Sequence, residues 1–427
     1  MKHHALVLVL VAVATGVAAA DVPLTLPDAQ RRAVDRSMQL VAQDAAISAS
    51  RHMAVAAGQL PDPIFKAGLD NVPVSGPDRY SLSDDLMTMR RIGLMQEVTG
   101  SEKRQLRSAR YELEAEKAAA EKSALIASIQ RDTALAWLDR YYAEAILHLA
   151  AEQIAQSRLE IEGAEGAYRA GRGSQADVFN ARASLALLED RASEYRRRLA
   201  AAKVALARWI GEDAQRPLSD KPALDATPVH GHHLPDEVAR HPMMEVLARQ
   251  EQLAASEVKL ASANRSPDWS IEVSYQNRGS AYPDMMSVGV SIPLTWDRPH
   301  RQDQELASKI AMSQQASAAR ADALQAHIAE VEAMVVEWDD DHSRLRRYEA
   351  ELIPLAHERA EATLTAYRGA KASLADVLAA RRGEIDMRMQ ALQLEMEAAR
   401  LWAQLSFLEP DASLLPAKMA DFQGGEP

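Results

Sequence analysis

Two segments in the second half of the chain alternate strictly between apolar and polar residues. The apolar positions of the first segment are Trp269, Ile271, Val273 and Tyr275, and residues 286–294 show the same alternation. A period of two indicates β-strands with one apolar and one polar face. Residues 65–69 repeat this pattern in the first half, and residues 89–98 form their return strand although two arginines interrupt the alternation. The sequence therefore predicts one β-hairpin in each half.

Each predicted hairpin lies between two helical stretches of unequal length. Residues 28–58 and 236–264 precede the hairpins, and the runs that follow, residues 101–162 and 301–353, contain no glycine or proline. At 1.5 Å per residue, the first run would span roughly 90 Å as one helix. An ordinary compact domain does not need a helix of that length.

Glycines then mark a reversal of the chain in each half. They are Gly163, Gly166, Gly171 and Gly173 in the first half and Gly369 in the second. Residues 174–210 and 370–410 return along the preceding helices, and only Gly383 interrupts the second of these runs. The simplest packing is two long antiparallel helical hairpins, each joined to a β-hairpin.

The two halves are copies of one unit of about 200 residues. Ala167-Tyr168-Arg169 recurs as Ala366-Tyr367-Arg368, and the serine, aspartate and arginine that follow recur at the same offset of 199 residues. The sequence Leu-Pro-Asp also occurs twice, from Leu26 and from Leu234, ahead of the two preceding helical stretches.

Composition and charge narrow the function classes. The 427 residues carry a formal charge of −12, which argues against a nucleic-acid-binding surface. The absence of cysteine excludes disulfides, thiolate metal sites and cysteine nucleophiles. No phosphate-binding loop, nucleophile elbow or zinc-protease motif is present, so we expect neither enzyme activity nor a cofactor.

The first twenty residues predict export. Lys2 precedes an apolar run, residues 5–13, and three alanines, Ala18 to Ala20, form a small-residue cleavage site. This arrangement is typical of a secretory signal peptide. No later segment reaches the 18 apolar residues that a membrane-spanning helix needs.

In an exported chain, the alternating strands favour a membrane barrel over a hairpin that covers a soluble core. Trp269 and Tyr275 lie at the two ends of one apolar row, roughly 20 Å apart, close to the spacing of the aromatic girdles of outer-membrane barrels. Four strands cannot close such a barrel, which starts at about eight strands. Two chains would give a barrel filled by its own side chains, whereas three chains would give twelve strands and a lumen.

The repeated reversals also carry a resemblance. They read YRAGRGSQADVFNAR from Tyr168 and YRGAKASLADV from Tyr367. With the Leu-Pro-Asp segments and the repeated pair Pro61-Asp62 and Pro267-Asp268, they resemble the TolC-type outer-membrane factor family over residues 24–410. The resemblance implies a mainly α fold with a β-barrel part. Three copies of this chain would form a 12-stranded outer-membrane β-barrel and a periplasmic α-helical barrel.

The resemblance also implies function and partners. The homotrimer would be the exit duct of a tripartite efflux system, embedded in outer-membrane lipid. It would work with a periplasmic adaptor, or membrane fusion protein, and an inner-membrane pump of the resistance-nodulation-division type. The compact length and the lack of a lipid-bearing cysteine are most similar to the heavy-metal efflux branch. A multidrug or type I protein secretion duct is the alternative, and a periplasmic coiled-coil scaffold or adaptor is the alternative from another class.

The family assigns roles to the residues of the two reversals. By resemblance, the adaptor-contact residues are Arg169, Gly171, Ser174, Asp177, Arg368, Ala370 and Ser373. Asp376 would belong to an acidic ring that gates the closed end of the duct, although Ala379 stands where the family often has a second acid. Serine at a helix start and aspartate in the first turn also have a purely structural explanation. Because Gly171 and Gly173 are replaced by Ala370 and Ala372, we expect the second reversal to be the stiffer one.

Two further sets of residues are candidates for binding. Asp70 and Glu272, expected to face the lumen, would favour cations electrostatically. Three histidines between the repeats, His230, His232 and His233, are weak candidates for a metal site, since a histidine-rich exported linker is more often simply solvated. His241 follows in the same linker.

The predicted organisation follows the repeat. It comprises a signal peptide (1–20), an N-terminal segment and helix (21–60), a β-hairpin (61–98), a long helical hairpin (99–210), a linker and helix (211–266), a second β-hairpin (267–294), a second long helical hairpin (295–409) and a flexible tail (410–427).

Overall fold

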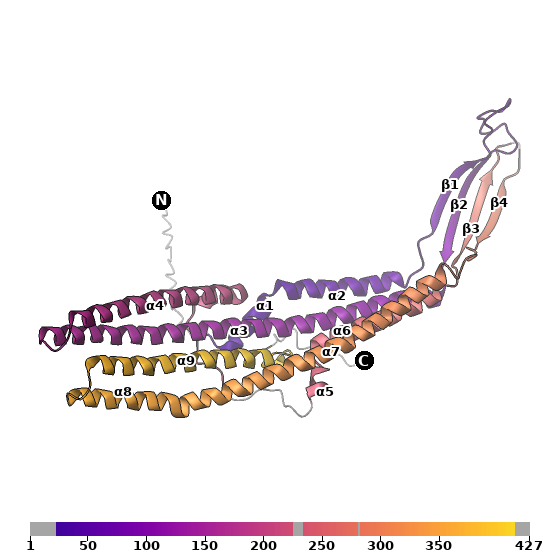
Figure 1. The fold of residues 1–427 in the computed structure, drawn as a ribbon. Coiled ribbons are helices and arrows are strands. Elements are labelled where there is room, and N and C mark those ends of the chain that lie inside the picture. The colour runs from indigo at the N-terminus through magenta and orange to yellow at the C-terminus, as the bar shows by residue number, and fades with distance from the viewer. Residues whose placement is uncertain (1–22, 225–233, 281, 415–427) are drawn as a thin grey trace, which may run out of the picture. The chain divides into compact units, whose positions relative to one another are not determined.

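The computed structural model describes residues 23–224, 234–280 and 282–414, which form long helices and one β-sheet (Figure 1). The chain divides into two compact units. The described parts of the first unit are residues 23–36, 133–224 and 345–396, and those of the second are residues 37–132, 234–344 except 281, and 397–414.

The helices follow the predicted duplication. In the first copy they are α1 (Leu26–Arg36), α2 (Met38–Ala57), α3 (Ser101–Arg169) and α4 (Gln175–Ile210). In the second copy they are α5 (Leu234–Val238), α6 (Pro242–Ala263), α7 (Gln302–Arg347), α8 (Ile353–Arg368) and α9 (Leu374–Ser406). Short 3₁₀ turns lie at Gly211–Gln215 and Ala412–Leu414.

The glycines interrupt these helices less than expected. Helix α3 continues through Gly163 and Gly166, and α9 continues through Gly383, because a single helical glycine costs only about 1 kcal/mol relative to alanine. Gly163 has a packing reason, since a Cβ there would lie 2.9 Å from Cδ2 of Leu374. Pro354 does not end its helix either, because a π-helical segment, Tyr348–Leu352, connects α7 to α8 just before it.

The helical stretches ahead of the strands are each split in two. Ser37 separates α1 from α2, and its side chain accepts a hydrogen bond from the backbone N–H of Leu40 at 3.3 Å. His241 has the equivalent position before α6, where Pro242 occupies the first turn. A serine N-cap and an early proline both start helices, so each stretch begins anew there.

The four strands form one antiparallel sheet in the order β1-β2-β3-β4. They are β1 (Ile64–Asp70), β2 (Met89–Val98), β3 (Trp269–Asn277) and β4 (Met285–Ser291). The strand predicted at 89–98 is confirmed, and β2 joins the two hairpins by pairing with β3. Strand β4 ends three residues before the expected Leu294, because Pro293 has no N–H to donate.

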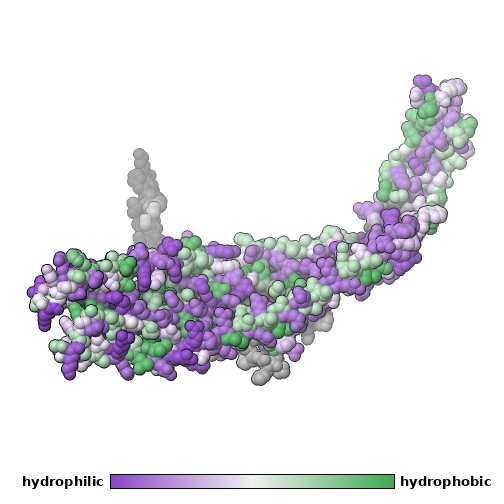
Figure 2. Space-filling view, in the orientation of Figure 1, coloured by the Kyte–Doolittle hydropathy of each residue, from purple (hydrophilic) through white to green (hydrophobic). Residues whose placement is uncertain are grey.

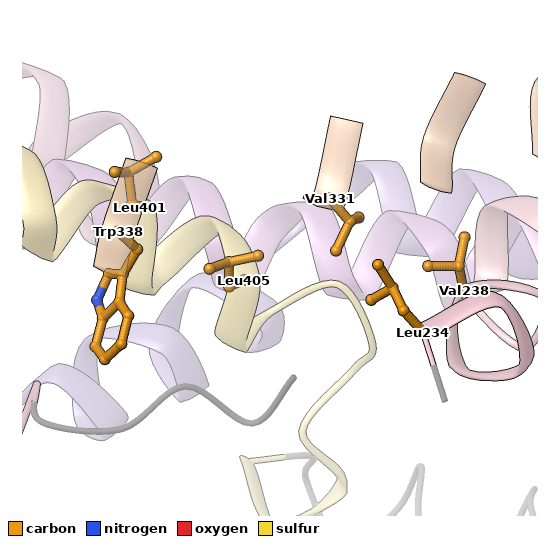
Figure 3. Close-up of a cluster of buried hydrophobic side chains, with 6 residues drawn as sticks. All are labelled: Leu234, Val238, Val331, Trp338, Leu401 and Leu405. Atoms are coloured by element: carbon orange, nitrogen blue, oxygen red, sulfur yellow. The ribbon is translucent and has the colours of Figure 1, made fainter. Parts of the chain in front are cut away.

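Each unit has its own buried residues. In the first unit, Trp137 is fully buried on α3 and donates from Nε1 to the carbonyl of Leu24 at 3.2 Å. Arg140, 2% exposed, donates to the carbonyls of Ala214 and Arg216, both at 2.7 Å. The second unit contains a hydrophobic cluster of Leu234, Val238, Val331, Trp338, Leu401 and Leu405 from α5, α7 and α9 (Figure 3).

Candidate functional site

The first reversal connects α3 to α4 through a left-handed glycine. Gly171 has φ +68°, and its N–H and that of Arg172 donate to the carbonyls of Tyr168 at 3.0 Å and Ala167 at 2.9 Å. These bonds satisfy carbonyls at the C-terminus of α3, as in a Schellman motif.

Ser174 and Asp177 then begin α4 with a reciprocal capping box. Ser174 Oγ accepts from the N–H of Asp177 at 3.2 Å, and Asp177 Oδ2 accepts from the N–H of Ser174 at 2.8 Å. The hydrogen bonds from the backbone and side chain of Ser174 hold the pKa of Asp177 below its ordinary value. The predicted serine cap is confirmed.

The second reversal has the same two backbone hydrogen bonds at its turn as the first. The N–H groups of Ala370 and Lys371 donate to the carbonyls of Tyr367 at 2.9 Å and Ala366 at 2.8 Å. Ala370 has φ +55°, so an alanine holds the left-handed conformation that glycine holds in the first copy. Alanine therefore removes backbone freedom there at the cost of local strain.

Ser373 and Asp376 repeat the capping arrangement at the start of α9. Asp376 Oδ2 accepts from Ser373 Oγ at 2.6 Å and from the Ser373 N–H at 2.9 Å. These two bonds lower the pKa of Asp376, which keeps the carboxylate ionised. Arg169 and Arg368, the other expected contact residues, are exposed at the ends of α3 and α8.

A cavity of about 520 Å³ brings the two reversals together within the first unit. It is lined from the first reversal by Arg172, Gly173 and Asp177 and from the second by Ser373. Ala379 also lines it, whereas Asp376 does not. Of the residues that the resemblance assigns to adaptor contact, Asp177 and Ser373 line this cavity.

Two charged residues of this cavity were not anticipated from the sequence. Glu160 is 4% exposed, and Nη2 of Arg382 lies 3.6 Å from its Oε2. Burial raises the pKa of Glu160 by more than Arg382 lowers it. Both residues lie in long polar helices, where sequence spacing gave no reason to distinguish them from solvated charges.

The sheet of the second unit separates an apolar from a polar face. The apolar face carries Phe65, Leu69, Ile92, Leu94, Val273, Tyr275, Met286, Val288 and Val290, all between 40% and 72% exposed. Hydrophobic residues are visible at the surface of the strand region in Figure 2. A solvent-exposed apolar face of this extent marks an interaction surface.

Asp70 and Glu272 lie on the polar face, where each has a basic partner. Lys66 Nζ is 2.7 Å from Glu272 Oε2, and Arg91 Nε is 3.0 Å from Asp70 Oδ2. Arg91 also approaches Glu272, with Nη1 3.6 Å from Oε1. Lys66 and Arg91 were not considered as site residues from the sequence, although the alternation of each strand places them on this face.

Two histidines form a pair in the described part of the second unit. His230, His232 and His233 lie outside the described residues. His241 Nδ1 instead lies 3.0 Å from Nε2 of His327, and His327 Nδ1 lies 3.2 Å from a carboxylate oxygen of Glu330. Burial, followed by the charge of His327, lowers the pKa of His241 to about 4. Within the described ranges, no group of three or more metal-ligating side chains converges.

No helix among the residues that the structure describes combines the length and the apolar character needed to cross a bilayer.

Comparison with known proteins identifies the fold. The sequence matches no protein-family model, and it matches no curated protein. Solved structures, however, align over 90% of the chain. One is the outer-membrane channel OprN, with 18% identity, a TM-score of 0.76 and 90% of that chain covered.

The chain has the fold of an outer-membrane channel. The outer membrane protein VceC of Vibrio cholerae aligns at 20% identity with a TM-score of 0.73, covering 90% of this chain and 95% of VceC. CusC, whose structures concern transmembrane channel formation, aligns at 14% identity with a TM-score of 0.75, covering 90% of this chain and 92% of CusC. The predicted mainly helical, TolC-like fold is confirmed, and the two predicted β-hairpins form one small antiparallel sheet.

Proposed function

We propose that this chain forms the outer-membrane exit duct of a tripartite efflux system, together with a periplasmic adaptor and an inner-membrane pump of the resistance-nodulation-division type. The strands would cross the outer membrane and the helices would extend into the periplasm. The fold shared with outer-membrane channels and the resemblance of the repeated reversals support this proposal.

The observation that carries the proposal is the two-faced sheet. Its apolar face is exposed along all four strands, and its polar face holds the charged residues. The nine and ten residues of β3 and β2 match the length of a tilted membrane-spanning strand. Alternation of lipid-facing and lumen-facing residues is the pattern of a transmembrane barrel.

The sheet edges support a trimer. Among the strands of the described residues, β1 pairs only with β2 and β4 only with β3. Unpaired edges invite pairing with another chain. Three copies joined edge to edge would close twelve strands around a lumen, with the helices forming the periplasmic barrel.

Fractionation tests the duct against the scaffold alternative. We expect the processed chain in the outer membrane, as an oligomer that resists detergent and dissociates on heating. Recovery as a soluble periplasmic monomer would instead support a coiled-coil scaffold or adaptor and reject the duct.

We assign adaptor contact to the two reversals and gating to Asp376. Gly171→Trp should impair pump assembly while leaving the oligomer intact, since the reversal and the strands belong to different units. Crosslinking to the adaptor and gel mobility of the oligomer measure the two effects separately. Gly171→Trp that still assembles and supports efflux would contradict the docking role.

The gate has a matched control in the other copy. Asp376→Ala should raise passive conductance in a reconstituted bilayer because it removes acid from the ring. Asp177→Ala removes the equivalent capping carboxylate from the first reversal and should leave conductance unchanged. Equal conductance of both variants and the parent would show that Asp376 is only a cap.

For cargo, we propose heavy-metal cations, with drugs or secreted proteins as the alternative. Deletion of the gene should sensitise cells to zinc, cobalt, nickel, cadmium, copper or silver. Unchanged metal tolerance with increased sensitivity to dyes would favour the multidrug alternative.

A further inference from the structure

Four charged side chains form one cluster on the polar face of the sheet. Lys66 and Asp70 come from β1, Arg91 from β2 and Glu272 from β3, and the ion pairs among them measure 2.7, 3.0 and 3.6 Å. All four side chains are between 25% and 35% exposed, so they interact with one another and also remain accessible to solvent.

Two glycines let the basic side chains lie across the sheet. Lys66 is opposite Gly93 on β2, so its side chain meets no other side chain there and extends over β2 to Glu272 on β3. Arg91 is opposite Gly68, whose Cβ, if present, would lie 3.9 Å from an Arg91 guanidinium nitrogen. The two glycines therefore leave the space that the long basic side chains occupy.

The cluster carries no net charge. Asp70 and Glu272 alone would make this part of the polar face acidic, and the expected preference for cations was based on these two carboxylates. Lys66 and Arg91 cancel that charge at distances far shorter than the screening length of about 10 Å at 0.1 M salt. The remaining acid on the polar face of β2, Glu97, is six residues from Arg91, about 20 Å along the strand.

We propose that Lys66 and Arg91 determine the charge selectivity of the duct at the level of this cluster, by neutralising Asp70 and Glu272 so that the section lined by the cluster passes cations and anions alike. The inference rests on the proposed function, since it requires the polar face to line a lumen. It implies that cargo is not sorted by charge in this section, and that any preference for metal cations arises elsewhere in the system.

Reversal potentials of the purified full-length protein in planar bilayers, under a potassium chloride gradient, test the proposal. All variants carry Asp376→Asn, which removes the charge at the proposed gate and retains an oxygen acceptor for the Ser373 cap. The otherwise unaltered protein should show a cation-to-anion permeability ratio near one. The Lys66→Gln/Arg91→Gln variant, left with two unpaired acids per chain, should raise this ratio roughly threefold or more at low salt.

Two controls assign the effect to the cluster. Arg90→Gln removes the same charge from the neighbouring position of β2, on the opposite face of the sheet, and should not change the ratio. Adding Asp70→Asn and Glu272→Gln to the double variant should return the ratio to that of the parent, because neutrality is restored.

The outcomes separate this inference from the proposed function. A parent that forms no conducting channel contradicts the duct itself. A parent that conducts but already selects cations strongly overturns the inference, even if the double variant fails to insert. An unchanged ratio in an inserted double variant, or an equal shift in Arg90→Gln, overturns it as well.

Discussion

Each reversal contains one residue with left-handed backbone, so the strain at Ala370 can be measured by comparison with Gly171, its equivalent in the first copy. Ala370 has φ +55° where Gly171 has φ +68°. A Cβ in this region costs about 1–2 kcal/mol, of which up to about 1 kcal/mol is offset because glycine is more flexible in the opened chain. A Cβ on Gly171 would meet no atom within 4 Å, so packing does not change this balance, and we expect a net cost of about 1 kcal/mol.

Native-state hydrogen exchange reports this difference locally. Ala370→Gly should slow exchange of the Lys371 amide, which donates to Ala366, by about fivefold, the equivalent of 1 kcal/mol. Gly171→Ala should accelerate exchange of the Arg172 amide, which donates to Ala167, by a similar factor.

Ala372→Gly is the matched control, because Ala372 is not among the residues with positive φ. It relieves no strain and adds only flexibility, so protection at Lys371 should stay the same or fall. Slower exchange in Ala372→Gly than in Ala370→Gly, or no change in Ala370→Gly, would refute the strain argument. Unchanged or faster exchange in Ala370→Gly would favour the simpler expectation that alanine stiffens the second reversal without penalty.

Three further predictions concern the packed helices. His241, whose pKa is lowered from 6.5 to about 4, is neutral in the folded chain, so its contribution is complete above pH 6.5 and is lost as the pH falls toward 4. Unfolding titrations should show a loss of roughly 3 kcal/mol over this window that is absent in His241→Gln, and the same pH dependence in the parent and in His241→Gln would contradict the role of His241. Arg140→Met should destabilise the first unit by about 2–4 kcal/mol in denaturant unfolding, because the buried carbonyl of Ala214 and the partly buried carbonyl of Arg216 lose their donor; a change below about 0.5 kcal/mol would show that water replaces the guanidinium group. Leu405→Ala, at a site 1% exposed, should cost about 2–5 kcal/mol by thermal unfolding, and Leu187→Ala, at a site 67% exposed, about 0.5 kcal/mol or less; equal losses would contradict the assignment of the core.

Local patterns predicted the fold well where they repeat. The alternation of β3 placed Val273 and Tyr275 on one face, and the capping residues Ser174 and Asp177 located the start of α4 correctly. Both signals depend on backbone geometry within a few residues. Gly163 misled because its small size serves contact with Leu374, which is more than 200 residues away in the sequence.

The candidate site was predicted less completely, because pairing between distant residues is not readable from spacing. Asp70 and Glu272 were recognised as acids on the polar face, but their partners become apparent only when register brings β1, β2 and β3 together. Glu160 and Arg382 likewise meet only in the folded first unit. The pairing of acids with bases in these two clusters could therefore be seen only in the structure.

The exposed apolar face and open edges of the sheet have a consequence for biogenesis. Before it meets other copies, a newly exported chain would present side chains such as Phe65, Met286 and Val288, each more than 60% exposed, together with two strand edges able to pair with any extended segment. Such intermediates aggregate readily at ordinary concentrations. Delivery by periplasmic chaperones and simultaneous insertion with partner chains would keep these surfaces away from water, so limiting chaperone supply should reduce the yield of this protein before it affects exported proteins whose sheets are already closed.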